Sequence, residues 1–301
     1  MVTALPLYHI FALMVNFLSY FKIGATNVLI PNPRDMEAFV KEWSKWRVTA
    51  FTGVNTLFVG LMHTPGFASQ DFSKLRVCMG GGAPVQNAVS ARWKSITGQH
   101  ITEGYGLSET SPILTANPLS LTEAIGSIGI PFPSTDISIR DDDGKEVAMG
   151  EAGELCAKGP QVMRGYWQND TANAECFTPD GYFKTGDIAT VDAEGYFRIV
   201  DRKKDMILVS GFNVFPNEIE DVIAHLDGVM ESACVGVPDD KTGEAVKVFV
   251  VRSKDSVTED DIIAHCRKEL AAYKVPRQIV FKAELPKSTV GKILRRELRD
   301  A

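Results

Sequence analysis

The hydrophobic pattern changes its period twice along the chain, and these changes limit the folds that the chain can adopt. Up to about Thr110, stretches with helical spacing of apolar residues alternate with short apolar runs. Arg34–Trp46 reads as a helix, whereas Val48–Phe51 and Leu75–Met79 read as strands. Strands that alternate with helices predict a parallel sheet. The first 115 residues are therefore expected to form an α/β subdomain.

Between residues 116 and 203 the pattern becomes that of an antiparallel, β-rich subdomain. Short runs such as Asp136–Arg140 and Gly153–Lys158 are separated by turn dipeptides, of which Asp143-Gly144 is one. Residues 1–203 are thus predicted to be one large domain with an α/β part and a β-rich part.

A third pattern begins at residue 204. Met206–Ser210 reads as a strand and Pro216–Leu226 as a helix. A further helix is expected after Thr258, because Asp261 stands three residues on and completes a capping box. Residues 204–301 are predicted to form a small α+β domain of their own.

The amino-terminal segment Ile10–Leu18 is apolar, but it is too short to span a bilayer. It also lacks the basic region that opens a signal peptide. A buried helix is the expected structure. A chain that opens directly in such a helix indicates truncation.

Composition excludes several classes of function. The 301 residues suggest about two domains, and the net charge of −6 argues against bulk nucleic-acid binding, which needs a basic surface. The cysteines are scattered, with no CxxC pair, which is typical of free thiols in a reducing cytoplasm and predicts neither a disulfide nor a metal site. They are Cys78, Cys156, Cys176, Cys234 and Cys266.

Two segments of the first 115 residues carry residue types that serve nucleotide chemistry. The glycines of Gly80–Pro84, between a predicted strand and a helix, let a ligand approach the backbone, although a tight turn explains them as well. In Glu103–Thr110 an aromatic residue between two glycines has a face to offer a purine base. The hydroxyl and carboxylate that follow suit phosphate and Mg²⁺. A surface loop is the alternative.

Two later segments complete the set. In Asp180–Lys204, Asp187 is suited to accept both hydroxyls of a ribose and Arg202 adds a donor of fixed geometry; the alternative is a hairpin with a charged end. In Pro286–Ile293, Lys292 is placed to bring one ammonium group into a cleft. A solvated basic tail is the alternative there.

The order of these four segments resembles that of the adenylate-forming superfamily, which includes acyl-CoA synthetases, luciferases and the adenylation domains of peptide synthetases. The resemblance covers the whole chain and is closest to bacterial long-chain fatty-acid–CoA ligases. Further segments that resemble motifs of the superfamily are Leu5–His9, Gly126–Gly129, Gly153–Leu155 and Gly165–Tyr166.

The resemblance implies a reaction in two steps: a carboxylate attacks the α-phosphate of Mg·ATP to give an acyl-adenylate, and the thiol of coenzyme A then displaces AMP. It implies that Lys292 is the catalytic lysine and Lys204 the hinge of a mobile carboxyl-terminal domain. Tyr105 is expected to stack on adenine, Ser108 to contact phosphate in place of the usual threonine, and Glu109 to hold Mg²⁺. The expected nucleotide site comprises Gly82, Ala83, Gly104, Tyr105, Gly106, Ser108, Asp187 and Arg202. The expected acyl site comprises His9, Phe11 and Gly81, and the expected coenzyme A tunnel Ser210, Gly211 and Phe212.

The glycine- and hydroxyl-rich loop by which the superfamily grips the β- and γ-phosphates has no counterpart in the sequence. The chain is therefore expected to be part of a truncated large domain followed by the small domain, and to adenylate poorly by itself. Three alternatives stay open: a non-catalytic nucleotide- or CoA-binding relative, a split enzyme completed by a separate amino-terminal chain, and a ligase for medium-chain or aryl acids. A cytoplasmic location is expected, and peripheral contact with the inner face of the membrane stays open.

Overall fold

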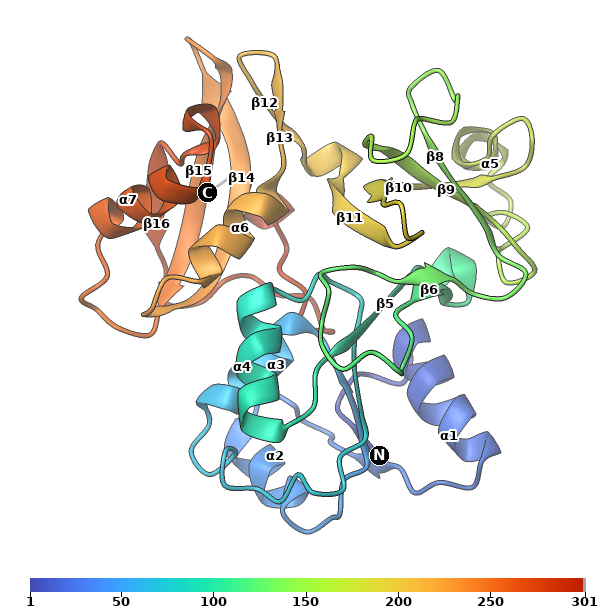
Figure 1. Cartoon of the computed structure of the whole chain (residues 1–301), viewed down its shortest axis with the longest axis vertical. Coiled ribbons are helices and arrows are strands. Elements are labelled where there is room, and N and C mark those ends of the chain that lie inside the picture. Colours follow the sequence, from blue (N-terminus) through green and yellow to red (C-terminus); the bar gives the residue numbers. More distant parts are fainter. Residues whose placement is uncertain (300–301) are drawn as a thin grey trace. The chain divides into compact units, whose positions relative to one another are not determined.

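A computed structural model describes residues 1–299. The chain divides into two compact units, Met1–Ile199 and Val200–Ala301 (Figure 1). The division falls within strand β11 (Phe197–Arg202), four residues before the domain boundary that the sequence pattern predicts. Each unit has its own sheets and its own core.

The first unit contains a seven-stranded sheet with the strand order β2-β1-β3-β4-β5-β6-β7. The first five strands are parallel, which confirms the predicted parallel sheet, and β6 and β7 add to it in antiparallel fashion. The sheet therefore continues past residue 115, where the sequence pattern changes. The strands are β1 (Val2–Thr3), β2 (Val28–Leu29), β3 (Ala50–Gly53), β4 (Val77–Gly80), β5 (Thr102–Gly106), β6 (Ile113–Ala116) and β7 (Ile130–Pro131).

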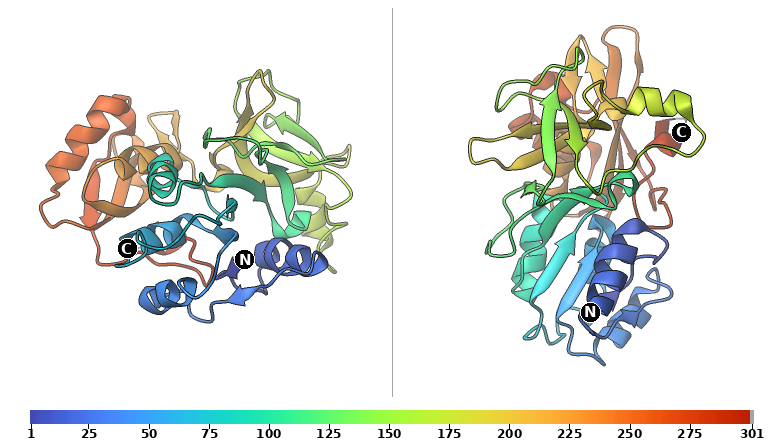
Figure 2. Two further views of the ribbon diagram at one scale, coloured as in Figure 1. Left: turned by 60° about the horizontal axis from the view of Figure 1, so that its bottom comes forward. Right: turned by 90° about the vertical axis from the view of Figure 1, so that its right-hand side faces the viewer.

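An aromatic cluster fixes three helices to one face of this sheet. Phe51 of β3 contacts Trp43 at a ring-centroid distance of 5.1 Å, and Phe58 contacts Trp93 at 4.8 Å. All four side chains are almost completely buried, so they form much of the apolar core of this layer. The helices that contribute to it are α2 (Met36–Trp43), α3 (Asn55–His63) and α4 (Asn87–Thr97), which Figure 2 shows beside the sheet.

The opposite face of the sheet carries a π-helix over Ala12–Leu18, which continues as α1 (Ser19–Lys22). Asn16 fixes it, because its Nδ2 donates to Thr52 Oγ1 at 2.7 Å and its Oδ1 accepts from the same hydroxyl at 2.9 Å. A helix forms in this segment, as predicted, but the prediction that it is buried is wrong. Only Ala12 and Asn16 are buried in the π-helix, and Phe21 is 71% exposed.

The rest of the first unit is built on a four-stranded antiparallel sheet with the order β11-β10-β9-β8. Its strands β8 (Asp136–Arg140) and β9 (Gly153–Lys158) have the predicted bounds, and β10 spans Phe183–Val191. Helix α5 (Asp170–Cys176) lies between β9 and β10 in the sequence. The buried side chains of this part include Leu114, Ile139, Leu155, Ala157, Ala189 and Phe197.

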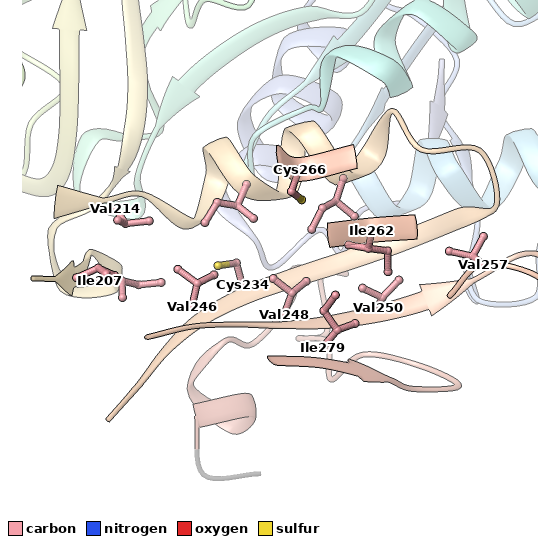
Figure 3. Packing of buried hydrophobic residues seen from close by; sticks show 13 residues of the cluster. Ile207, Val214, Cys234, Val246, Val248, Val250, Val257, Ile262, Cys266 and Ile279 are labelled. Atoms are coloured by element: carbon pink, nitrogen blue, oxygen red, sulfur yellow. The ribbon is translucent and has the colours of Figure 1, made fainter. Parts of the chain in front are cut away.

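The second unit is the predicted α+β fold. Its sheet has the order β13-β12-β15-β14, and β16 pairs with β15. Helix α7 begins with the predicted capping box, in which Thr258 N donates to Asp261 Oδ2 at 2.9 Å. Figure 3 shows the apolar core of this unit, formed by side chains such as Ile207, Val248 and Ile262. The elements are β12 (Ile207–Val209), β13 (Phe212–Val214), α6 (Pro216–Ala224), β14 (Val229–Asp239), β15 (Gly243–Arg252), α7 (Glu259–Glu269), β16 (Gln278–Phe281) and α8 (Arg296–Arg299).

None of the helices in residues 1–299 is both long enough and apolar enough to cross a bilayer.

Candidate active site

The predicted glycine segments lie together at one edge of the seven-stranded sheet. Strands β4 and β5 are parallel neighbours, with Gly80 opposite Glu103, so the residues that follow them emerge at the same edge. A Cβ on Gly81 would lie 3.2 Å from the carbonyl oxygen of Gly104, and Gly82 has a left-handed φ of +76°. The carboxyl ends of parallel strands are where open α/β sheets bind ligands. Gly82, Ala83 and Gly104 are thus placed at this edge.

A tight turn follows Tyr105. Gly106 lies so close to the returning chain that a Cβ there would be 1.7 Å from the carbonyl oxygen of Pro112. Ser108 and Glu109 lie in a short 3₁₀ helix (Ser108–Thr110), and Thr110 Oγ1 accepts from Leu107 N at 3.0 Å. The side chain of Ser108 is exposed. The turn therefore holds the predicted phosphate-binding hydroxyl at a fixed place on the surface of the unit.

Tyr105 and Asp187 meet, although 82 residues separate them. The Tyr105 hydroxyl donates to Asp187 Oδ2 at 2.5 Å, and Asp187 is 8% exposed. The ring of Tyr105 is partly buried against the core of the β-rich part. The residues predicted to hold adenine and ribose therefore lie in direct contact. The sequence did not predict the hydrogen bond between them.

The turn before Asp187 is held by side chains that the sequence analysis did not assign. Gly186 has a φ of +74°, and its N–H donates to Glu154 Oε1 at 3.1 Å. Thr185 Oγ1 donates to the carbonyl of Leu155 at 2.8 Å and accepts from Asp187 N at 3.2 Å. These bonds fix the backbone on which the Asp187 carboxylate stands.

The predicted metal ligand Glu109 contacts a tyrosine. The Tyr166 hydroxyl donates to Glu109 Oε1 at 2.9 Å. Burial and this hydrogen bond raise the pKa of Tyr166 to about 12, so the hydroxyl keeps its proton at neutral pH. Asn173 of α5 fixes the tyrosine, because its Oδ1 accepts from Tyr166 N at 2.6 Å and its Nδ2 donates to the carbonyl of Tyr166 at 3.0 Å. Gly165 is close to the same amide: a Cβ there would lie 2.8 Å from Asn173 Oδ1.

The three predicted acyl-site residues lie together, with Phe11 between Gly81 and His9. The ring of Phe11 lies 3.3 Å from the position of a Cβ on Gly81, so the glycine makes room for this ring. His9 Nδ1 lies 3.3 Å from Phe11 N, as the acceptor of a hydrogen bond in the tautomer that leaves Nδ1 unprotonated. The space beside Gly81 is filled by a side chain of this unit.

The other predicted site residues belong to the second unit. Arg202 ends β11, and Lys204 is exposed in a 3₁₀ helix, Lys203–Asp205. Ser210 and Gly211 form the tip of the hairpin between β12 and β13, with φ of +51° and +83°. Their predicted roles remain predictions.

Phe212 and Lys292 are the last two of these residues. Phe212 follows the hairpin tip and stacks on Tyr273 at a ring-centroid distance of 4.8 Å. Lys292 lies in a loop near the carboxyl end, and its N–H donates to Ser288 Oγ at 3.2 Å. The basic segment around it is thus an ordered loop.

No group of three or more His, Cys, Asp or Glu residues in the described part of the chain is arranged to hold a metal ion. The role of Glu109 remains a prediction, in which Mg²⁺ bound with a nucleotide takes one or two carboxylates and completes its ligands with phosphate and water. The oxygen donors of Ser108 and Glu109 are of the kind that this hard cation prefers.

The chain belongs to the family of AMP-binding enzymes. The family profile of AMP-binding enzymes matches residues 1–167, and that of the AMP-binding enzyme C-terminal domain matches residues 218–292.

Known relatives extend this likeness over the whole chain. A long-chain-fatty-acid–CoA ligase of Yersinia pestis is 58% identical over 299 residues, which are 99% of this chain and 53% of the relative. A feruloyl-CoA synthase of an Amycolatopsis species is 39% identical over 98% of this chain and 60% of the relative. An anthranilate CoA ligase crystallised with anthranoyl-AMP superposes with a TM-score of 0.92 at 31% identity, over 99% of this chain and 58% of that structure. The chain thus spans about half the length of the ligase that it matches.

Proposed function

We propose that this chain takes part in the ATP-dependent activation of a long-chain fatty acid to its CoA thioester through an acyl-adenylate. The observation that carries the proposal is the 2.5 Å contact of Tyr105 with Asp187, because it joins the predicted adenine and ribose contacts in one site. The 58% identity to a long-chain-fatty-acid–CoA ligase supports the choice of acid.

In the first step, Tyr105 presents its ring to adenine, and Asp187 accepts the ribose hydroxyls with Arg202 as a further donor. Ser108 and the N–H groups beside Gly82 and Ala83 face the phosphates. Lys292 neutralises the charge that gathers on the α-phosphate as the carboxylate attacks.

The metal part of the proposal rests on Glu109. Its carboxylate holds Mg²⁺ on the nucleotide, with the Tyr166 hydroxyl fixing one of its oxygens. The ion supplies charge neutralisation on the phosphates when it is bound. The chain's own contribution is to keep the carboxylate in one orientation before the nucleotide arrives.

In the second step, coenzyme A replaces AMP on the acyl group. We assign Ser210, Gly211 and Phe212 to its pantetheine arm and Lys204 to the hinge of the carboxyl-terminal unit. Gly211 has no heavy atom within 4 Å of the position of an added Cβ, so a side chain at this tip would point into open space.

The test is a substrate panel on a full-length ligase that carries this chain. ATP, Mg²⁺ and coenzyme A are supplied with acids of rising length and with ferulate and anthranilate, and acyl-CoA and AMP are measured. We expect the highest kcat/KM with long-chain fatty acids. A preference for ferulate or anthranilate would replace this proposal by that of an aryl-CoA ligase, which the 39% identity to a feruloyl-CoA synthase keeps as the second candidate.

A second assay compares the 301-residue chain by itself with the same chain mixed with the separately expressed amino-terminal part of a relative. We expect weak acyl-adenylate formation from the chain by itself. Strong activity on mixing would support a split enzyme. If neither the chain by itself nor the mixture turns over but ATP still binds, the result would support a non-catalytic relative.

For the location we propose the cytoplasm, with peripheral contact at the inner face of the membrane. Sedimentation with vesicles tests that contact.

A further inference from the structure

The loop that carries Lys292 is closed on itself. The N–H of Leu294 donates to the carbonyl of Pro286 at 2.9 Å, and Ser288 N donates to the carbonyl of Lys292 at 2.8 Å. Ser288 Oγ also accepts from Lys292 N at 3.2 Å. The backbone of Lys292 is therefore bonded in both directions to one serine across the loop.

Both ends of this loop are anchored to the rest of the second unit. At the first end, Lys287 Nζ lies 2.7 Å from Glu231 Oε2. Near the second end, Ile293 packs against an apolar cluster that contains Leu285 and Leu298. Arg295 follows the loop, and its side chain contacts several residues of the second unit.

The guanidinium of Arg295, which has five N–H donors, makes four hydrogen bonds and one further ion pair. Nε and Nη2 grip the two oxygens of Glu220 at 3.0 and 2.8 Å, and Nη2 also donates to Asn217 Oδ1 at 2.6 Å. Nη1 donates to Asp201 Oδ1 at 3.2 Å and lies 3.5 Å from Asp205 Oδ2. Asp201 and Asp205 flank the predicted hinge residue, so one side chain ties the hinge segment, α6 and the Lys292 loop together.

This cluster is withdrawn from water. The side chain of Arg295 is 15% exposed, that of Glu220 14% and that of Asp201 0%. Desolvation raises the pKa of Asp201 and of Glu220, whereas the three carboxylates hold the pKa of Arg295 above its usual value. A planar fork with five donors fits these partners, and the point charge of a lysine does not.

We propose that Arg295 is a positioning residue for Lys292, and that it sets the place of the loop 286–294 for the adenylation step. The inference rests on the proposed function, because it assigns to Arg295 the task of keeping the Lys292 ammonium where the α-phosphate reacts. Arg295 itself is directed into the carboxylate cluster and acts only through the two residues that separate it from Lys292, Ile293 and Leu294.

The test separates the two half-reactions in a full-length ligase carrying Arg295→Lys. Acyl-adenylate formation is followed by pyrophosphate exchange, and the second step is followed by giving the enzyme synthetic acyl-adenylate and coenzyme A. We expect adenylate formation to fall about 10- to 100-fold, because a displacement of about 1 Å costs up to that much. The second step should fall less than the first, because the predicted role of Lys292 lies in the first step only, whereas the second step feels only the change in the hinge segment that Arg295 also holds.

Arg296→Lys is the matched control. Arg296 belongs to the same basic tail, but its side chain is exposed and makes no hydrogen bond or ion pair in the structure between residues 1 and 299. It should leave both half-reactions near wild type. A milder variant, Asn217→Ala, removes one of the five Arg295 contacts and keeps every charge, and it should lower adenylate formation by a smaller factor. The Asn217→Ala variant tests the inference if Arg295→Lys fails to fold.

Hydrogen exchange of the 301-residue chain gives a readout that needs no turnover. In Arg295→Lys the amides of the segment 286–294 should exchange faster than in wild type, while those of β14 and β15 stay protected. Equal loss of both half-reactions, or unchanged exchange in 286–294, would overturn the inference. If the wild-type ligase makes no acyl-CoA, the proposed function fails, and the exchange result still judges the link between Arg295 and the loop.

Discussion

Tyr105 Oη and Asp187 Oδ2 lie 2.5 Å apart, and they join the end of β5 in one sheet to β10 in another. A carboxylate that is 8% exposed needs donors, because burial of an unpaired charge is costly. The tyrosine therefore has a structural role in the nucleotide-free protein in addition to its proposed contact with adenine.

Tyr105→Phe should lower the free energy of unfolding by about 1.5–3 kcal/mol, the usual contribution of a hydrogen bond to a charged group. Urea denaturation of the 301-residue chain measures it, and a double-mutant cycle with Asp187→Asn isolates the pair. The control is Tyr182→Phe, since Tyr182 also donates its hydroxyl to a carboxylate, that of Asp136, at an exposed position. The control should cost less than about 0.5 kcal/mol.

Lys292→Ala in a full-length ligase should lower the rate of pyrophosphate exchange about 100- to 1000-fold, because one preorganised donor to the reacting phosphate is lost. Binding of ATP should change little, as measured by equilibrium dialysis. Lys268→Ala is the control, since Lys268 is exposed on α7, outside the loop 286–294. Wild-type exchange rates in Lys292→Ala would refute the catalytic assignment.

Tyr166→Phe removes the hydroxyl that donates to Glu109 and keeps the ring. We expect the Mg²⁺ concentration for half-maximal rate to rise about 3- to 10-fold, in line with the 10- to 100-fold that loss of an outer partner typically costs at a tighter metal site. Binding of Mn²⁺ with ATP, followed by electron paramagnetic resonance, should weaken to the same extent. An unchanged Mn²⁺ affinity would mean that Tyr166 only supports the loop.

Gly106→Ala should destabilise the first unit by more than about 4 kcal/mol, the range of mutations that force backbone to move. The reason is the 1.7 Å approach of the added Cβ to the carbonyl oxygen of Pro112. Gly144→Ala is the matched control: Gly144 has a φ of +79° with no atom within 4 Å, so it should cost only the left-handed strain of about 1–2 kcal/mol. Thermal denaturation of the chain compares the two.

The buried cysteines predict loss of stability at alkaline pH. Burial raises the pKa of Cys156 and of Cys266 to about 11 and that of Cys78 to about 12. In the unfolded chain these thiols lose their protons near pH 8.5, so above that pH the unfolded state binds fewer protons than the folded state. The free energy of unfolding should therefore fall from about pH 8.5 towards pH 11.

In the folded chain at pH 8, a thiol reagent should modify the partly exposed Cys176 first.

Sequence alone predicts those features whose causes are local. The bounds of β8 and β9 follow from alternating side chains and turn dipeptides, and the start of α7 follows from Thr258 and Asp261, three residues apart. The attachment of the π-helix to the sheet has a different origin, because Asn16 takes its partner from Thr52, 36 residues away. No window of sequence contains that bond.

In the candidate site, too, contacts between residues far apart in the sequence could not be predicted from local patterns. Tyr105 and Asp187 were predicted to share a site only because their segments resemble a known family, since no spacing rule links residues 82 positions apart. Tyr166 and Arg295 had no predicted role. The partners of Arg295, at positions 201, 205, 217 and 220, lie far from it in the sequence, and a basic tail gives no sign that one of its arginines is buried.

The antiparallel strand β6 covers the edge of β5 that would otherwise end the parallel part of the sheet. A truncated version that stops at residue 115, where the sequence pattern changes, would cut β6 and remove β7, leaving the unpaired N–H and C=O groups of β5 open to strands of other molecules. Such a piece is expected to aggregate. Dissection of the protein should instead keep the first unit together with all of β11, to Arg202.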